Sequence, residues 1–215
     1  MKVGILGTGD VGISIAKGFA GIGYDVMIGS RDPNSNKAKA AGKEVDSNAK
    51  VGTFEDTAKF GDIIVICIKG SGIENALHLA GPENFAGKVV IDVTNPLDFS
   101  KGKLPGLLVG HTDSAGEQIQ RLLPKAHVVK ALNIVGSDDM IHPDFPGGPP
   151  DMFLCGNNAN AKKTVTEILH KFGWSSVTDC GTIEASRYIE PMTIIWVLYA
   201  AQAGTWSVAF KMLKK

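Results

Sequence analysis

The sequence predicts a doubly wound α/β fold, in which helices cover both faces of a parallel sheet. Short apolar runs alternate with helical segments from the N-terminus onward. Residues 62–68 and 88–93 are nearly continuous apolar runs, which is typical of strands buried on both faces. A glycine-rich turn joins the first run to the first helical segment. This pattern favours parallel strands joined by right-handed crossovers.

Periodicity predicts the elements of the N-terminal half. Residues 2–6 form a first strand, and apolar residues spaced three and four apart from Val11 to Ala20 form a first helix. A second strand covers residues 25–28. Asp32 followed by Pro33 predicts the start of a second helix, with Asp32 as its N-cap, that continues to about residue 41. The next predicted elements are a strand at 50–52, a short helix from Glu55, a strand at 62–68, a helix at 73–79 and a strand at 88–93.

The C-terminal half contains the clearest boundary of the chain, the Pro- and Gly-rich stretch 142–150. Before it, Ser114 and Glu117 form a capping-box pattern that starts a helix, and residues 128–132 form a strand. Beyond it we expect a strand at 152–155, a helix at 159–172, a strand at 176–178 and a long apolar terminal helix that reaches Phe210. We therefore assign residues 1–135 to the core and residues 136–215 to a small α/β extension packed on it.

Composition limits the partners and the location. Lys plus Arg and Asp plus Glu both total 22, so the formal net charge is zero and nucleic-acid binding is not expected. Residues 191–210 carry no charge, but their polar residues favour a helix buried in the core or in a subunit interface over a membrane span. Because this helix is apolar on more than one face, we expect a homodimer. The N-terminus lacks a secretory pattern, which predicts a cytoplasmic protein.

The turn after the first predicted strand has the spacing of a dinucleotide fingerprint. A glycine at its start permits a tight turn, the second lets a pyrophosphate approach the backbone, and the third allows close packing of the helix. The helix N-terminus offers free amides and the positive end of a dipole to phosphate. The sequence therefore predicts a Rossmann-type nucleotide site at Gly7, Thr8, Gly9, Asp10, Val11 and Gly12.

The end of the second predicted strand distinguishes the two nicotinamide cofactors. A carboxylate at this place binds the ribose 2′-hydroxyl of NAD(H) and repels a 2′-phosphate. Here Ser30 and Arg31 offer a hydroxyl donor and a guanidinium fork, and Lys37 adds a third contact. The alternative is a solvated Arg31, with Asp32 available to the ribose. We predict NADP(H), because Asp32 is better used as a helix cap.

Residues at the ends of later strands are expected to line the nicotinamide and the acceptor, because open α/β sheets bind ligands at this edge. The ring-facing candidates are Ile68, Lys69, Asn95, Asn133 and Ile134. Each has an equally plausible interpretation as a turn or core residue. The chain has no Tyr followed four residues later by Lys, no G-x-S-x-G and no His or Cys at metal-ligand spacing, so neither a catalytic side chain nor a metal site is predicted.

The chain resembles the coenzyme F420-dependent NADP oxidoreductases. The resemblance rests on residues 7–12, the Gly29-Ser30-Arg31 segment, residues 94–97, residues 129–133 and the closing apolar helix. It implies NADPH at the glycine turn and the Ser-Arg pair, and hydride transfer between nicotinamide and a stacked deazaflavin. Where the deazaflavin enzymes have His, this chain has Asn133, which is similar to the NADPH-binding domains of the six-transmembrane metalloreductases, whose acceptor is a flavin.

We therefore predict an NADPH-dependent oxidoreductase that transfers a hydride to F420 or to a flavin. Direct transfer between stacked rings requires orientation and exclusion of water rather than an acid or a base. Two alternatives stay open at this point. One is an NADPH-dependent reductase of a small carbonyl or imine substrate, and the other is a sensor that binds NADPH without turning it over.

Overall fold

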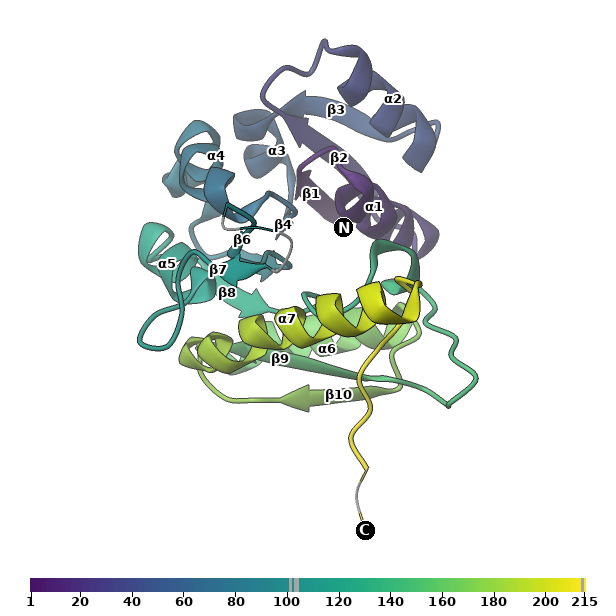
Figure 1. Ribbon diagram of the computed structural model, residues 1–215. Coiled ribbons are helices and arrows are strands. Elements are labelled where there is room, and N and C mark those ends of the chain that lie inside the picture. The colour runs from purple at the N-terminus through teal and green to yellow at the C-terminus, as the bar shows by residue number, and fades with distance from the viewer. Residues whose placement is uncertain (101, 103–104, 214) are drawn as a thin grey trace.

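The computed structural model describes residues 1–100, 102, 105–213 and 215 and contains one eight-stranded sheet (Figure 1). The strands lie in the order β10-β9-β8-β5-β4-β1-β2-β3. Their bounds are β1 Lys2–Leu6, β2 Asp25–Ser30, β3 Lys50–Thr53, β4 Ile63–Ile66, β5 Val89–Asp92, β8 His127–Lys130, β9 Asp151–Gly156 and β10 Ser176–Asp179. A separate antiparallel pair is formed by β6 (Leu97–Asp98) and β7 (Gly106–Leu107).

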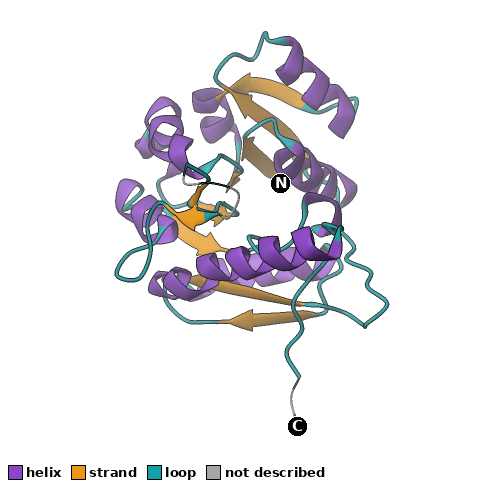
Figure 2. Cartoon of the chain, in the orientation of Figure 1, coloured by secondary structure: helices purple, strands orange, loops and turns teal. Residues whose placement is uncertain are grey.

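Helices cover the sheet on both sides (Figure 2). They are α1 Asp10–Gly21, α2 Asn36–Val45, α3 Phe54–Phe60, α4 Ile73–Ala80, α5 Ala115–Leu122, α6 Ala159–Lys171 and α7 Ser186–Ala203. Four short 3-10 turns cover Gly70–Gly72, Pro82–Phe85, Ser137–Asp139 and Ile183–Ala185. The doubly wound α/β fold that the sequence predicts is confirmed.

The core follows from the apolar runs. Every residue of β4 is buried, as expected of a strand between two helical layers. Strand β1 is buried from Val3 onward, because it lies between β2 and β4 in the middle of the sheet. Phe19 on α1 packs edge-on against Phe172, which follows α6, with ring centroids 5.1 Å apart. This contact joins the N-terminal helix to the C-terminal extension.

The direction of β9 differs from the expected parallel sheet. Strands β1 to β5 and β8 are parallel, whereas β9 pairs antiparallel to β8, with Lys130 opposite Cys155. Strand β10 then runs parallel to β9. The long connection from β8 through the Pro- and Gly-rich stretch contains no crossover helix among its described elements. The chain therefore enters β9 at the edge of the sheet where β8 ends, and the two strands run in opposite directions.

The expected start of α2 at Asp32 is wrong. Ser35 is the N-cap, and its side chain accepts a hydrogen bond from the Ala38 amide. Asp32 instead closes a local turn in which its carboxylate accepts from the Asn34 amide at 2.9 Å. The helix therefore begins later than predicted and continues to Val45. Ser35, three residues after Asp32, is an equally suitable N-cap residue, and the local sequence does not distinguish Asp32 from Ser35.

The expected continuation of the terminal helix to Phe210 is also wrong. Helix α7 ends at Ala203, because Gly204 takes a left-handed conformation and forms the C-cap. The segment after it folds back, and the Trp196 indole donates to the Val208 carbonyl at 2.7 Å. The Asp151 amide donates to the Phe210 carbonyl at 2.9 Å. Within the described part of the chain, no helix has the length and apolarity needed to cross a bilayer.

Candidate active site

The glycine turn has the geometry of a phosphate cradle. Gly7 has a φ of +131°, and a Cβ there would lie 2.4 Å from the Cys67 carbonyl oxygen. A Cβ on Gly12 would lie 2.4 Å from the Gly7 carbonyl oxygen, so glycine is needed for α1 to pack against the turn. At Gly9, by contrast, a Cβ would meet no described atom within 4 Å. The backbone beside Gly9 is therefore open to a ligand.

The rest of the turn continues into α1. Gly9 is the N-cap residue and has no side chain to occupy the amides of the first turn, which leaves them available to a phosphate. Thr8 is half-buried and Asp10 is exposed at the first helical position. Val11 packs partly against the core. The residues present fit a dinucleotide, with the pyrophosphate over Gly9.

The predicted 2′-phosphate site lies where β2 ends. Arg31 and Lys37 are both exposed, and neither forms an ion pair with another described residue. The Ser30 hydroxyl donates to the Asp32 carbonyl at 3.0 Å and accepts from the Asp32 amide at 3.3 Å, so it stabilises its own turn. The two cations are therefore the groups free to bind a phosphate. Ser30 is the last residue of β2, Arg31 follows it directly, and Lys37 lies in the first turn of α2.

The loops after β4 and β5 lie against each other at the same edge. Ile68 is half-buried and Lys69 is exposed. A Cβ on Gly70 would lie 2.8 Å from the Asn95 carbonyl oxygen and 2.9 Å from the Pro96 Cα, so these two loops are in direct contact. Ile134 is only 2% exposed and belongs to the core.

Asn95, Asn133 and Thr193 form a hydrogen-bonded amide cluster. The Asn133 Nδ2 donates to Asn95 Oδ1 at 3.0 Å and to the Ile189 carbonyl at 3.2 Å. The Asn95 Nδ2 donates to the Asn133 carbonyl at 2.7 Å. The Thr193 hydroxyl lies 2.8 Å from Asn95 Oδ1 and 3.0 Å from the Asn133 carbonyl. Asn133 Oδ1 is buried and accepts no hydrogen bond from the described residues.

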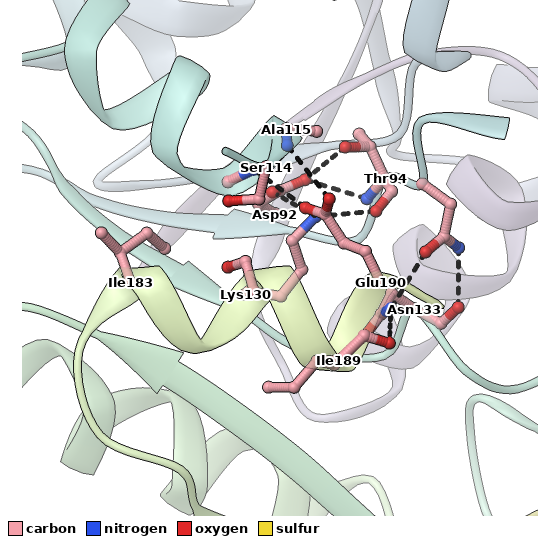
Figure 3. A network of polar contacts seen from close by, with 12 residues as sticks. Asp92, Thr94, Ser114, Ala115, Lys130, Asn133, Ile183, Ile189 and Glu190 are labelled. Atoms are coloured by element: carbon pink, nitrogen blue, oxygen red, sulfur yellow. Dashed lines mark hydrogen bonds and ion pairs between the residues drawn. The ribbon is translucent and has the colours of Figure 1, made fainter. Parts of the chain in front are cut away.

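A buried ionic triad of Asp92, Lys130 and Glu190 lies next to this cluster (Figure 3). Lys130 Nζ lies 2.6 Å from Asp92 Oδ2 and 2.8 Å from Glu190 Oε1, and it donates to the Thr94 carbonyl at 2.8 Å. The Lys130 and Asp92 side chains are 0% exposed and that of Glu190 is 2% exposed. Burial opposes a charge on Lys130, but Asp92 and Glu190 outweigh it and raise the pKa of this ammonium.

Each carboxylate of the triad has further donors. Asp92 Oδ1 accepts from the Thr94 amide at 2.9 Å and from its hydroxyl at 2.7 Å. Glu190 accepts from the Ala115 amide at 3.0 Å and from the Gly116 amide at 2.9 Å, which are the first amides of α5. The triad therefore connects the ends of β5 and β8 to α5 and α7.

The triad and Thr193 were not among the residues predicted from the sequence. A signal was present, because Asp92 and Lys130 are charges within apolar strand runs, and Glu190 immediately precedes the uncharged stretch 191–210. Buried charges of this kind are found paired. What the sequence could not show is that α7 returns to the ligand edge, where Glu190 reaches Lys130 of β8 and the first amides of α5.

Comparison with known proteins agrees with this geometry. A family model described as NADP oxidoreductase, coenzyme F420-dependent, matches residues 2–96. An F420-dependent NADP reductase of Methanocaldococcus jannaschii is 31% identical over 202 residues, which cover 90% of this chain and 89% of the relative. The metalloreductase STEAP3 of Rattus norvegicus is 29% identical over 197 residues, but the match spans only 36% of that longer protein.

Solved structures extend the comparison. A protein from Arthrobacter sp. FB24, whose own assignment as an F420-dependent NADP reductase is inferred, is 37% identical and superposes over 100% of both chains with a TM-score of 0.95. A reductive aminase from Aspergillus terreus, solved with NADPH, is 18% identical and superposes with a TM-score of 0.67 over 94% of this chain and 63% of its own. The second likeness concerns the fold alone.

Proposed function

Because the chain belongs to the family of F420-dependent NADP reductases, we propose that it transfers a hydride between NADP(H) and a deazaflavin of the F420 type. The observation that carries this proposal is the open backbone at Gly9, at the N-terminus of a helix that directly follows the first strand. Arg31 and Lys37 supply the charges for a 2′-phosphate. The amide cluster lies at the same sheet edge and supplies polar groups for the two rings.

The protein's part in the reaction is to hold two rings in contact. When bound, NADPH supplies the hydride, and the deazaflavin takes up that hydride and one proton from solvent, which leaves NADP⁺ and the two-electron-reduced acceptor. Ile68, Lys69 and Asn95 line the carboxyl ends of β4 and β5, where the nicotinamide is expected. We assign Asn133 Oδ1, a buried acceptor with no donor among the described residues, to a ring N–H. No side-chain acid or base is required.

An acceptor screen tests this function. NADPH is mixed with the protein and with F420, FMN, FAD or riboflavin, and the loss of NADPH absorbance is followed. We expect the fastest oxidation of NADPH with F420. Faster oxidation with FMN or FAD than with F420 would identify a flavin reductase. Oxidation of NADPH only by carbonyl or imine compounds would contradict hydride transfer between rings. Tight NADPH binding without turnover for every acceptor would indicate a sensor.

We also propose that the protein is a homodimer with α7 in the interface. Tyr188, Ile195 and Tyr199 on α7 are 76%, 59% and 62% exposed, and Trp206 in the segment after it is 58% exposed. Exposed aromatic and aliphatic side chains grouped in this way are typical of subunit contacts. The segment after Gly204 covers only part of this face, and a groove remains between α7 and Val208.

Light scattering at micromolar concentration should give the mass of a dimer. Ile195→Asp with Tyr199→Asp should yield a folded monomer, because both side chains are exposed in one chain and a buried charge is unfavourable only in the interface. Leu79→Asp, at an apolar residue on α4 that is 51% exposed, is the matched control and should remain dimeric. A monodisperse monomer of the unmodified protein would contradict this proposal.

A further inference from the structure

The triad of Asp92, Lys130 and Glu190 has two carboxylates for one ammonium and therefore a formal net charge of −1 (Figure 3). Both carboxylates accept hydrogen bonds from N–H or O–H donors in addition to their contact with Lys130. Because the three side chains are at most 2% exposed, water and salt screen this charge very little.

The triad adjoins the amide cluster at the proposed ring site, because Asn133 donates to the carbonyl of Ile189, the residue before Glu190 (Figure 3). Asp92 and Lys130 are the last residues of β5 and β8, at the edge where ligands bind in open α/β sheets. Asn95 follows Asp92 by three residues and Asn133 follows Lys130 by three, so each pair is separated by at most about 10 Å of extended chain. Lys130 also holds the carbonyl of Thr94, the residue before Asn95.

The two oxidation states of the cofactor differ in charge at one place. The nicotinamide ring has a charge of +1 in NADP⁺ and none in NADPH, while the phosphates are the same in both. A fixed negative charge near the ring therefore stabilises NADP⁺ and leaves NADPH nearly unaffected. The positive end of α5, close to +0.5 at most, offsets only part of the charge of Glu190.

We propose that the triad sets the relative affinity of the protein for the two oxidation states of the cofactor and favours NADP⁺. This inference rests on the proposed function, since it requires the nicotinamide at this edge. A unit charge about 10 Å away, at an effective dielectric constant of about 20, changes the affinity for a cationic ring on the order of tenfold.

The measurement is the ratio of the two dissociation constants, Kd for NADP⁺ over Kd for NADPH. NADPH binding is followed by its fluorescence and NADP⁺ binding by competition. Glu190→Gln and Asp92→Asn each bring the net charge of the triad to zero, from different elements. Both should raise the ratio on the order of tenfold. Glu184→Gln is the matched control, because this exposed carboxylate is screened by solvent and should leave the ratio unchanged.

Glu190→Asp separates charge from structure. This variant keeps Lys130 and the net charge of −1, although the shorter side chain alters the buried contacts of residue 190. Its ratio should stay within about twofold of the unmodified protein, with folding checked by thermal unfolding. A ratio equal to that of Glu190→Gln would overturn the proposal, because the effect would then be structural.

The unmodified protein gives an independent test that no folding defect can obscure. Added salt should weaken the binding of both nucleotides through their phosphates but leave the ratio constant, since the triad is buried. A ratio that changes with salt would overturn the role of the triad but not the proposed function. The same holds if Glu190→Gln and Asp92→Asn leave the ratio unchanged while both nucleotides still bind. Failure of the unmodified protein to bind either nucleotide would instead overturn the proposed function.

Discussion

Lys130→Met should lower the free energy of unfolding by about 3–5 kcal/mol, because it leaves two buried carboxylates facing each other without a cation. Asp92 and Glu190 form ion pairs with Lys130 at 2.6 and 2.8 Å, and each of the three side chains is at most 2% exposed. Methionine keeps the volume of the lysine stem, so the loss measures the charge rather than a cavity. Urea unfolding followed by circular dichroism gives the value.

Lys17→Met provides the matched control for this experiment. Lys17 also forms an ion pair, with Glu44 at 2.8 Å, but its side chain is 45% exposed. Solvent replaces the lost partner there, so the free energy of unfolding should hardly change. Equal stability of the two variants would contradict the role of Lys130 in stabilising the buried triad.

Arg31→Ala should weaken the binding of NADPH about ten- to a hundredfold and leave NADH binding nearly unchanged. One charge-assisted hydrogen bond to a phosphate contributes about 1.5–3 kcal/mol, and only NADPH has the 2′-phosphate. Arg31 is exposed and is not engaged in an ion pair with any described residue, so its loss should not affect the fold. Titration of the variant with each nucleotide, followed by fluorescence, checks the prediction.

The control for Arg31 is another exposed guanidinium. Arg121 on α5 is paired with Asp113 at 2.7 Å, and Arg121→Ala should leave both affinities unchanged. The preference for NADPH should also decrease with added salt, because the 2′-phosphate site is exposed. Equal affinity of the unmodified protein for NADPH and NADH would contradict the assignment of Arg31 and Lys37 to the 2′-phosphate.

Much of the fold could be predicted because it depends on local patterns. The apolar run at β4 and the glycine turn before α1 are short-range signals, and both led to correct elements. The start of α2 was wrong because Asp32 and Ser35 offer equivalent local caps. The end of α7 was wrong because it depends on Gly204 and on the pairing of Trp196 with Val208, whereas the uncharged stretch of the sequence continues through this point.

The candidate site was predictable only in its nucleotide half. The spacing of Gly7, Gly9 and Gly12 is visible in the sequence, and it reflects the need for a backbone without side chains at these positions. The amide cluster joins Asn95 to Thr193, which are 98 residues apart, and the triad joins Asp92 to Glu190. Such groups meet only when α7 is packed across the ends of β5 and β8, and no local pattern encodes that packing.

The antiparallel direction of β9 has a consequence for how such a protein diversifies. Because β9 runs against β8, its carboxyl end lies at the edge opposite Asn95, and the loop that follows it is out of reach of the nucleotide. Helix α7 then brings Glu190 and Thr193, one turn apart, to the ligand edge. We therefore expect related chains that use different acceptors to differ by point substitutions on that face of the helix rather than by loop length. The N-terminal half should keep the same cofactor.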